Sequence, residues 1–348
     1  MKKKILITGI NGQDGAYLAD FLLKKNFEVH GIIRRTSTYK LARLEYLKIK
    51  DKIHFHHSEL NEDKNIEYII KKIKPHAIYN LAAQSFVEYS FSNPVGTFNI
   101  NYQSVLNILE FLRREKLDIK FYQASTSEMF GNTGVDMQNE NTKFNPASPY
   151  AVSKLTAHYL VKNYRESFNK FFVSGILFNH ESFLRGGEFV TKKIIYGLTK
   201  IKFGSKEVLK LGNLDSKRDW GHAKDYVQAM YLMTNSKKPD DYVVATGETN
   251  SIRKFIEVAC SYLGLHPVFE GNGLNEFCYD KKSGKIIIKV DKKYFRVNEL
   301  DRLKGDPSKI KKFLKWKIKF KFNDLVEDMV KDEVNNFQDN KKFSFFSR

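Results

Sequence analysis

A glycine-rich turn near the start of the chain constrains the fold more than any other feature. The segment Thr8-Gly9-Ile10-Asn11-Gly12-Gln13-Asp14-Gly15 follows an apolar run and opens a helical pattern. In such a turn the first glycine makes the tight bend, the second lets the backbone approach a pyrophosphate, and the third lets helix and strand pack closely. The alternative is an ordinary glycine-rich loop. We predict that the turn binds a dinucleotide through Gly9, Asn11, Gly12, Gln13, Asp14 and Gly15.

Short β-branched runs alternate with helical patterns through the first half of the chain, which is typical of βαβ units and a parallel sheet. The runs that predict strands are Lys4–Thr8, Glu28–Ile33, Ile53–His57, Ala77–Leu81, Phe121–Ser125 and Phe172–Phe178. The intervening patterns predict helices over Ala16–Lys25, Ile66–Ile73, Val95–Arg114 and Pro149–Phe168. We therefore expect an α/β fold built on a doubly wound parallel sheet.

The pattern loosens after residue 180, where glycines punctuate shorter elements. We expect residues 1–180 to form the nucleotide-binding domain, with segments near 214–255 returning to it. Residues 181–334 would form mainly a smaller, mixed α/β substrate lobe, and 335–348 a tail or an edge contact.

The formal net charge of +19 allows two interpretations. Phosphate attraction would suit a nucleic-acid binder, but acids are interleaved with the bases and no nucleic-acid motif is present, so we favour an anionic small-molecule substrate. The two cysteines, Cys260 and Cys278, are too far apart in sequence for a metal or redox motif. So few cysteines are typical of a protein in the reducing cytoplasm, where we expect this one. We expect no metal site, and no apolar run is long enough to cross a bilayer.

The end of the second predicted strand indicates which cofactor binds. An acid usually stands there to hold the ribose 2′-hydroxyl of NAD. Here Ile33 is followed by Arg34-Arg35-Thr36-Ser37. Guanidinium groups beside a hydroxyl suit a 2′-phosphate. The sequence therefore favours NADP over NAD, with Arg34, Arg35 and Ser37 as contacts, although a basic loop end in a basic protein is the simpler alternative.

Tyr150 and Lys154 form a YxxxK motif whose spacing puts phenol and ammonium on one helical face. The spacing alone is weak, because Tyr46 and Lys50, Tyr68 and Lys72, and Tyr196 and Lys200 share it. Context selects Tyr150, since Ser148 and Pro149 can start its helix. The fifth strand ends in Ser125-Thr126-Ser127-Glu128, at the sheet edge where ligands bind. Beside the motif, Thr126 and Glu128 are interpreted as a hydrogen-bond partner and an acid/base, instead of a turn cap and a solvated acid.

Together these residues resemble the extended short-chain dehydrogenase/reductase family, and more narrowly the GDP-mannose 4,6-dehydratase family. The resemblance runs from Ile7 to about Glu333. Its most specific segments include Leu81-Ala82-Ala83-Gln84-Ser85, Ser148 to Lys154, Asn179-His180-Glu181-Ser182, Arg218 to Val227 and Tyr294-Phe295-Arg296. Thr-Ser-Glu at residues 126–128, where the dTDP-glucose relatives have Thr-Asp-Glu, favours a GDP-sugar.

The resemblance implies a Rossmann-type fold and a mechanism. Tyr150, its pKa lowered by Lys154, would take the C4 hydroxyl proton of a GDP-sugar while NADP accepts hydride, with Thr126 steadying O4. Glu128 would remove the C5 proton and help the C6 hydroxyl to leave as water. The cofactor would stay tightly bound and be recycled. The product would be a 4-keto-6-deoxy sugar for surface-polysaccharide biosynthesis.

Residue matching extends the predicted site. The further cofactor contacts would be Glu59, Leu60, Leu81, Ala82, Ala83, Ser85, His180 and Arg185, together with Tyr150 and Lys154. The substrate contacts would be Ser85, Thr126, Glu128, Asn179, Lys193, Arg218, Arg296 and Glu299. Family members form dimers or tetramers, and the loop 34–38 often lies at the tetramer contact, so a homodimer or homotetramer is expected.

The chain departs from the family pattern at several positions. Glu59 replaces an Asp, Phe86 replaces a His and Gly96 replaces a Tyr. Phe183-Leu184 stands before Arg185-Gly186 where the pattern is Pro-Arg-Arg-Gly, and Val297 replaces a Pro. We expect Phe86 and Phe183-Leu184 to lie near the sugar pocket, which leaves two substrates open: GDP-mannose and GDP-manno-heptose.

Other functions remain open on the sequence alone. A nucleotide-sugar 4-epimerase or 4-reductase would share Tyr150 and Lys154 but would not need Glu128. A non-catalytic NADP-binding protein would need neither Tyr150 nor Lys154. Nucleic-acid binding is the remaining, weaker alternative.

Overall fold

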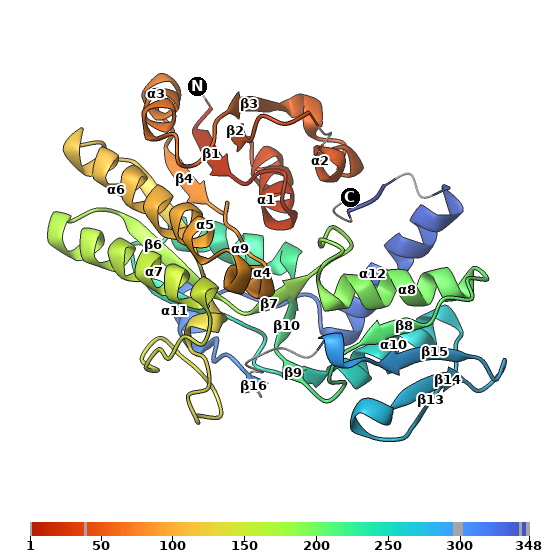
Figure 1. The fold of residues 1–348 in the computed structure, drawn as a ribbon. Coiled ribbons are helices and arrows are strands. Elements are labelled where there is room, and N and C mark those ends of the chain that lie inside the picture. Colours follow the sequence, from red (N-terminus) through yellow and green to blue (C-terminus); the bar gives the residue numbers. More distant parts are fainter. Residues whose placement is uncertain (1, 38–39, 295–301, 341–342, 346–348) are drawn as a thin grey trace.

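The computed structural model describes residues 2–37, 40–294, 302–340 and 343–345. Its central feature is a seven-stranded parallel sheet with helices on both faces (Figure 1). The predicted α/β, doubly wound fold is therefore confirmed. Within the described ranges, no helix combines the length and apolar character needed to span a bilayer.

The strand order across the large sheet places the first strand in the interior, between β4 and β2, as in dinucleotide-binding folds. The inner strands are almost entirely buried, because helices cover both faces of the sheet, whereas the edge strand β3 is partly exposed. In spatial order they are β3 (Ile53–His57), β2 (Glu28–Ile33), β1 (Lys4–Thr8), β4 (Ala77–Asn80), β5 (Lys120–Thr126), β6 (Phe172–Leu177) and β11 (Asp241–Val244).

Successive residues of β1 point to opposite faces and join two different cores. Ile5 and Ile7 pack on one face with α1 (Gln13–Lys24) and α9 (Ala223–Thr234). Leu6 packs on the other face. The helices that cover this second face are α3 (Asp63–Ile73), α6 (Ser104–Arg114) and α7 (Pro149–Phe168).

The helix predicted over Val95–Arg114 is interrupted. The chain forms α5 (Pro94–Phe98), a π-helical turn (Asn99–Gln103) and then α6. One extra residue per turn changes the helical phase and turns Asn101 inward, where it is 2% exposed. Apolar periodicity does not reveal such a turn, because the flanking residues still read as helix.

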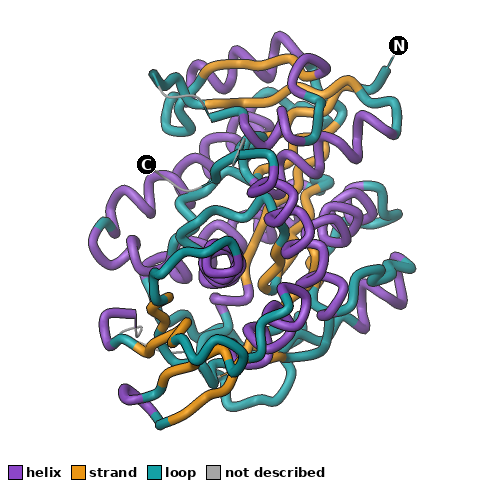
Figure 2. Tube along the Cα trace, turned by 90° about the vertical axis from the view of Figure 1, so that its right-hand side faces the viewer, coloured by secondary structure: helices purple, strands orange, loops and turns teal. Residues whose placement is uncertain are grey.

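The smaller lobe contains three short sheets and its own apolar core, built around Trp220, Phe255 and Leu325. Figure 2 shows its short strands at the end of the molecule far from the N-terminus. Its strands are β7 (Asn179–Glu181), β8 (Leu209–Leu211), β9 (Lys217–Arg218), β10 (Trp220–His222), β12 (Asn250–Ser251), β13 (Pro267–Glu270), β14 (Phe277–Asp280), β15 (Ile286–Val290) and β16 (Arg302–Leu303). Its helices are α8 (Val190–Lys202), α10 (Ile252–Leu263) and α12 (Phe322–Gln338).

The chain returns to the large sheet in places that differ from the predicted segment 214–255. Within it, α9 and β11 return, whereas β12 and α10 stay in the lobe. A further return, over α11 (Ser308–Leu314) and Trp316, was not predicted. The tail predicted from residue 335 begins inside α12.

Three shorter helices, α2 (Ala42–Tyr46), α4 (Val87–Ser92) and α5, flank the carboxyl edge of the sheet.

Candidate active site

A cavity of about 500 Å³ lies where the carboxyl ends of β4, β5 and β6 meet the smaller lobe. Parallel α/β sheets bind ligands at this edge. Many of the predicted residues line the cavity: Asp14, Leu81, Ala83, Ser85, Thr126, Glu128, Tyr150, Lys154, Asn179, His180, Arg185, Lys193 and Arg218. Within the described residues, no three His, Cys, Asp or Glu side chains gather closely enough to hold a metal ion.

The glycine turn has the geometry of a phosphate cradle. Gly9 has a φ of +69°, and a Cβ there would lie 2.8 Å from the Ala82 backbone. A Cβ on Gly15 would lie 2.3 Å from the Gly9 carbonyl oxygen. Gly12 is the N-cap of α1 and has no side chain to cap the first N–H groups. A helix start of this kind favours an anion, so the turn fits the pyrophosphate of a dinucleotide.

A buried polar network fixes the strand ends beside this turn. The Thr8 hydroxyl donates to Asn80 Oδ1 at 2.7 Å and accepts from the backbone N–H groups of Leu81 and Ala82 at 3.2 and 3.1 Å. The Asn80 amide in turn donates to Gln123 Oε1 at 2.9 Å. The network joins β1, β4 and β5, and so positions the Leu81–Ala83 segment against the turn.

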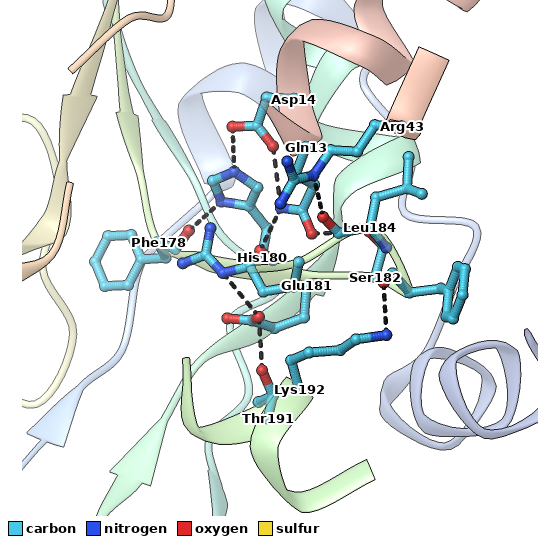
Figure 3. Close-up of polar contacts among 12 residues, drawn as sticks. Gln13, Asp14, Arg43, Phe178, His180, Glu181, Ser182, Leu184, Thr191 and Lys192 are labelled. Carbon is cyan, nitrogen blue, oxygen red and sulfur yellow. Dashed lines mark hydrogen bonds and ion pairs between the residues drawn. The ribbon is translucent and has the colours of Figure 1, made fainter. Parts of the chain in front are cut away.

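Asp14 and His180, which both line the cavity, form a partly buried ion pair (Figure 3). His180 Nε2 lies 2.7 Å from Asp14 Oδ2, and His180 Nδ1 lies 2.7 Å from the Phe178 carbonyl. Burial disfavours the charged form of both side chains, but their mutual attraction and hydrogen bond outweigh this effect. The pKa of Asp14 is therefore lowered and the pKa of His180 is raised. Gln13 bridges them, donating to Asp14 Oδ1 and to the His180 carbonyl, both at 3.1 Å.

Helix α7 places Tyr150 and Lys154 on the cavity wall. The Ser148 hydroxyl caps the helix by accepting from the Ala151 N–H at 3.1 Å, and Pro149 occupies the first turn. Tyr150 is 8% exposed and Lys154 is 4% exposed. Thr126 hydrogen-bonds Tyr150 from the end of β5, and the Thr126 hydroxyl accepts from the Glu128 N–H at 3.3 Å. Thr126, Glu128, Tyr150 and Lys154 thus share one cavity.

The pKa of Tyr150 differs from what the resemblance implies. Burial raises the pKa of Tyr150 to about 12, and the charge of Glu128 acts in the same direction, while the hydrogen bond from Thr126 and the charge of Arg185 oppose it. Burial also lowers the pKa of Lys154 to about 8. Both shifts follow from desolvation, which disfavours either charged form.

The predicted substrate residues come from the smaller lobe. The Lys193 ammonium donates to the Lys210 carbonyl at 2.7 Å and lies 3.4 Å from the Tyr294 ring centroid. Asn179 lies in β7 and Arg218, 6% exposed, in β9. The predicted contacts Arg296 and Glu299, and the departure at Val297, fall outside the described residues.

The predicted adenosine contacts lie away from this cavity. Arg34, Arg35 and Ser37 are exposed directly after β2. Glu59 and Leu60, which follow β3, are half-buried. Because β2 pairs in parallel with β1, and β3 pairs in parallel with β2, these residues share the carboxyl edge with the glycine turn. Their placement fits the distal half of a dinucleotide.

Asn101 is a positioning residue that the sequence did not reveal. Its side chain accepts from the Gln84 N–H at 2.9 Å and donates to the Gln84 carbonyl at 3.0 Å and to the Ser153 hydroxyl at 3.1 Å. It therefore joins the loop of Ala83 and Ser85 to the helix of Tyr150. The signal would have been a polar residue on the apolar face of a predicted helix.

Other unpredicted residues line the cavity, among them Glu88, Glu188 and Phe189. The Arg185 guanidinium lies 3.5 Å from the Phe189 ring centroid. The Phe86 ring meets the same Phe189 ring edge-on, with the two centroids 6.3 Å apart. Arg185 Nε also lies 3.1 Å from Glu181. The loop after β7 thus carries both charge and aromatic surface into the cavity.

The family departures have different surroundings. Phe86 lines the cavity, as expected. Phe183 and Leu184 do not: they are 1% and 0% exposed and belong to the core of the large domain. The expectation that they line the sugar pocket is wrong, because these two apolar side chains pack into the core under the loop instead of facing the cavity. At Gly96, a Cβ would meet the Asn93 side chain at 2.6 Å, and Asn93 caps α5.

Comparison with known proteins agrees with this geometry. The family model for GDP-mannose 4,6 dehydratase matches residues 6–329. The GDP-mannose 4,6 dehydratase of Cricetulus griseus is 46% identical over 97% of this chain and 93% of its own length. The GDP-mannose 4,6-dehydratase of Vibrio cholerae is 43% identical over 96% of this chain and 94% of its own length.

Solved structures show the same fold at lower identity. A dTDP-glucose 4,6-dehydratase from Bacillus anthracis in complex with NAD has a TM-score of 0.80 at 19% identity, and the match covers 98% of both chains. RMD from Pseudomonas aeruginosa, complexed with NADPH, has a TM-score of 0.74 at 19% identity over 96% of this chain and all of that chain. With a family model that spans nearly the whole sequence and relatives above 40% identity, the chain belongs to the GDP-mannose 4,6-dehydratase family.

Proposed function

We propose that this protein is a hydro-lyase that converts GDP-mannose to its 4-keto-6-deoxy product by removing one water. The observation that carries the proposal is the convergence of Thr126, Glu128, Tyr150 and Lys154 on one cavity that also reaches Asn179 and Arg218. The proton-transfer groups and the groups suited to a sugar diphosphate then line one cavity.

The protein's own residues would move the protons. A nicotinamide cofactor, when bound, would supply a reversible two-electron acceptor beside the sugar ring. Tyr150 would accept the C4 hydroxyl proton, with the Thr126 hydroxyl holding the same oxygen. Glu128 would remove the proton from C5 and deliver a proton to the departing C6 hydroxyl, which leaves as water. The hydride taken from C4 would then return to C6, and C5 would regain a proton equivalent to the one that Tyr150 accepted. Each positioned proton-transfer group contributes about 10² to 10⁴-fold.

A raised pKa makes Tyr150 a weak acid until positive charge lies near it. Lys154, whose pKa lies at about 8, can hold such charge at neutral pH. Arg185 acts in the same direction on Tyr150. We propose that these cations assist deprotonation of the phenol only once a ligand has excluded water from the cavity.

Which nicotinamide cofactor binds is part of the proposal. Arg34 and Arg35 support NADP, because they stand exposed at the carboxyl edge beside the glycine turn, where a 2′-phosphate would lie. The cofactor would remain bound and be recycled through turnover. Asp14 and His180 would fix the α1 start against the cavity, and Gly9, Gly12 and Gly15 would receive the pyrophosphate.

Assembly and location are further parts of the proposal. A homodimer or homotetramer with the loop after β2 at a contact follows from the family resemblance. A cytoplasmic location is supported by Cys260 and Cys278, which are both buried free thiols.

The direct test is mass spectrometry after incubation with GDP-mannose and, separately, with GDP-manno-heptose, with no cofactor added. The proposal expects the mass of one water to be lost from GDP-mannose, and NADP to be recovered from the denatured protein. Water loss from the heptose substrate alone would reassign the sugar and keep the reaction. An unchanged mass with both substrates, using protein that contains the cofactor, would contradict the dehydratase assignment.

A further inference from the structure

The segment Phe343-Ser344-Phe345, here called the C-terminal aromatic segment, folds back onto the large domain. It packs beside α2, where the Tyr46 ring meets the Phe343 ring edge-on at 5.4 Å. Phe345 is 6% exposed and belongs to the core beneath the glycine turn, and Phe343 packs against that core. Neither residue lines the cavity. The segment is therefore a built part of the fold whose role the proposed reaction does not explain.

Asn336 attaches this segment to α12. Its side-chain amide donates to the Phe343 carbonyl at 2.8 Å, and its Oδ1 accepts from the Phe343 N–H at 2.9 Å. Asn336 is 6% exposed, so water competes little with these bonds. The two hydrogen bonds set the direction in which the chain leaves the helix.

Phe345 contacts the loop that carries Arg185. The Gly187 N–H donates to the Phe345 carbonyl at 3.0 Å, and Gly187 itself lines the cavity. The Phe345 ring meets the Phe183 ring edge-on at 5.2 Å, and Tyr46 of α2 packs on Phe183 at 4.9 Å. The loop is thus bound at both sides of Arg185.

Arg43 connects the same ring to the glycine turn. Its guanidinium lies 5.1 Å from the Phe345 ring centroid. It donates from Nε to the Leu184 carbonyl at 2.7 Å, seen in Figure 3, and from Nη1 to the Asn11 carbonyl at 3.2 Å. One side chain therefore joins the C-terminal aromatic segment, the Arg185 loop and the turn.

A buried cation supports the loop from below. Lys192, 2% exposed, donates to the Phe183 carbonyl at 2.9 Å and pairs with Glu333 of α12. Its ammonium lies 3.9 Å from the Phe183 ring centroid and 5.5 Å from that of Phe345. Phe183 and Leu184, which depart from the family pattern, are the apolar residues that make this packing possible.

We propose that the C-terminal aromatic segment is a positioning element of the active site: Phe345 holds the loop 182–189, and through Arg43 the glycine turn, in the geometry that binds cofactor. The proposal rests on the proposed function only in naming the cofactor. The segment acts through Gly187, Leu184 and Asn11 and touches no reacting atom.

The test compares Phe345→Ala with Phe313→Ala, an exposed phenylalanine of α11 that serves as the matched control. Hydrogen exchange followed by mass spectrometry reports on the loop 182–189, and fluorescence titration of protein freed of its bound nucleotide reports the Kd for NADPH. For Phe345→Ala we expect exchange in the loop to be about tenfold faster, with little change in β4 and β5. We also expect the Kd to rise about tenfold, because a misplaced turn loses oriented contacts. Phe313→Ala should match the wild type in both.

Equal loop exchange and equal Kd in Phe345→Ala and Phe313→Ala would overturn the proposal. If Phe345→Ala speeds hydrogen exchange throughout the chain, the variant has lost its overall fold and cannot report on the loop. Asn336→Ala then decides by the same criteria, since it loosens the segment without opening a cavity under the loop. Neither readout needs turnover. Faster loop exchange and weaker NADPH binding in a protein that fails to dehydrate GDP-mannose would reject the proposed function and leave this inference standing.

Discussion

Lys154 carries a buried charge that lowers the stability of the fold and that the proposed reaction needs. Its ammonium is buried beside the cavity, and burial lowers its pKa to about 8 from the usual 10.5 of a lysine. Between these values the unfolded chain binds more protons than the folded one, so stability rises with pH through this window. At pH 7 the cost of keeping the charge is about 3 kcal/mol.

Replacing this cation should therefore stabilise the protein while disabling it. Lys154→Met keeps the side-chain length without the charge, and we expect a higher melting temperature than wild type at pH 7. The gap should narrow toward pH 10, where the wild-type lysine is neutral. Thermal unfolding at both pH values measures this, with Lys162→Met on the exposed face of α7 as control. A gap that stays the same at both pH values would show that desolvation of Lys154 is not its cause.

At this scale the sequence was informative where a motif has a fixed geometry. The spacing of Tyr150 and Lys154, and their place after Ser148-Pro149, predicted where they lie. It could not predict the direction of the Tyr150 pKa, which depends on burial by segments distant in the chain. Nor could it place Phe183 and Leu184, because their partner Phe345 lies at the far end of the sequence.

Among the elements, β11 is attached to α7 by a buried ion pair between Arg165 and Asp241. Arg165 of α7 contacts Asp241 of β11 through two hydrogen bonds of 2.8 Å, and its Nη1 also donates to the Phe172 carbonyl of β6 at 3.2 Å. Burial opposes the charge of Asp241, but the hydrogen bond with Arg165 outweighs it and lowers the pKa of Asp241. The pair attaches the last strand of the sheet to a helix on its face.

Asp241→Asn should leave a buried guanidinium without its counter-charge. We expect a loss of about 3 kcal/mol in the free energy of unfolding. The neighbouring Asp240→Asn removes only a more exposed pair with Lys309, and should cost no more than about 1 kcal/mol. Urea denaturation of both variants gives the comparison. Equal losses in the two would mean that the buried pair does not anchor β11.

Element boundaries were predictable where local signals were strong. β1, β2, β3 and α7 have the predicted bounds, because apolar runs and a Ser-Pro start define them. The interruption of the helix predicted over 95–114 was not predictable. Asn101 turns inward there to reach Gln84 and Ser153, which are distant in the sequence.

Over the whole molecule, the cavity depends on both parts of the chain. Tyr150 and Glu128 come from the large domain, whereas Lys193 and Arg218 come from the smaller lobe. The large sheet could be predicted because each βαβ unit is local in sequence. The lobe was described only in outline, since its short strands pair across long intervals, as β9 does with β16. The return of residues 308–316 to the large sheet has the same cause.

The central claim is that Glu128 removes a proton from the sugar whose C4 oxygen is held by Tyr150 and Thr126. The most direct measurement is the mass spectrum of GDP-mannose after incubation with Glu128→Gln that retains its bound cofactor. Our account predicts that the nucleotide sugar keeps its water, while C4 oxidation, followed by nicotinamide absorbance in a single turnover, still occurs. Water loss at the wild-type rate in this variant would contradict the account.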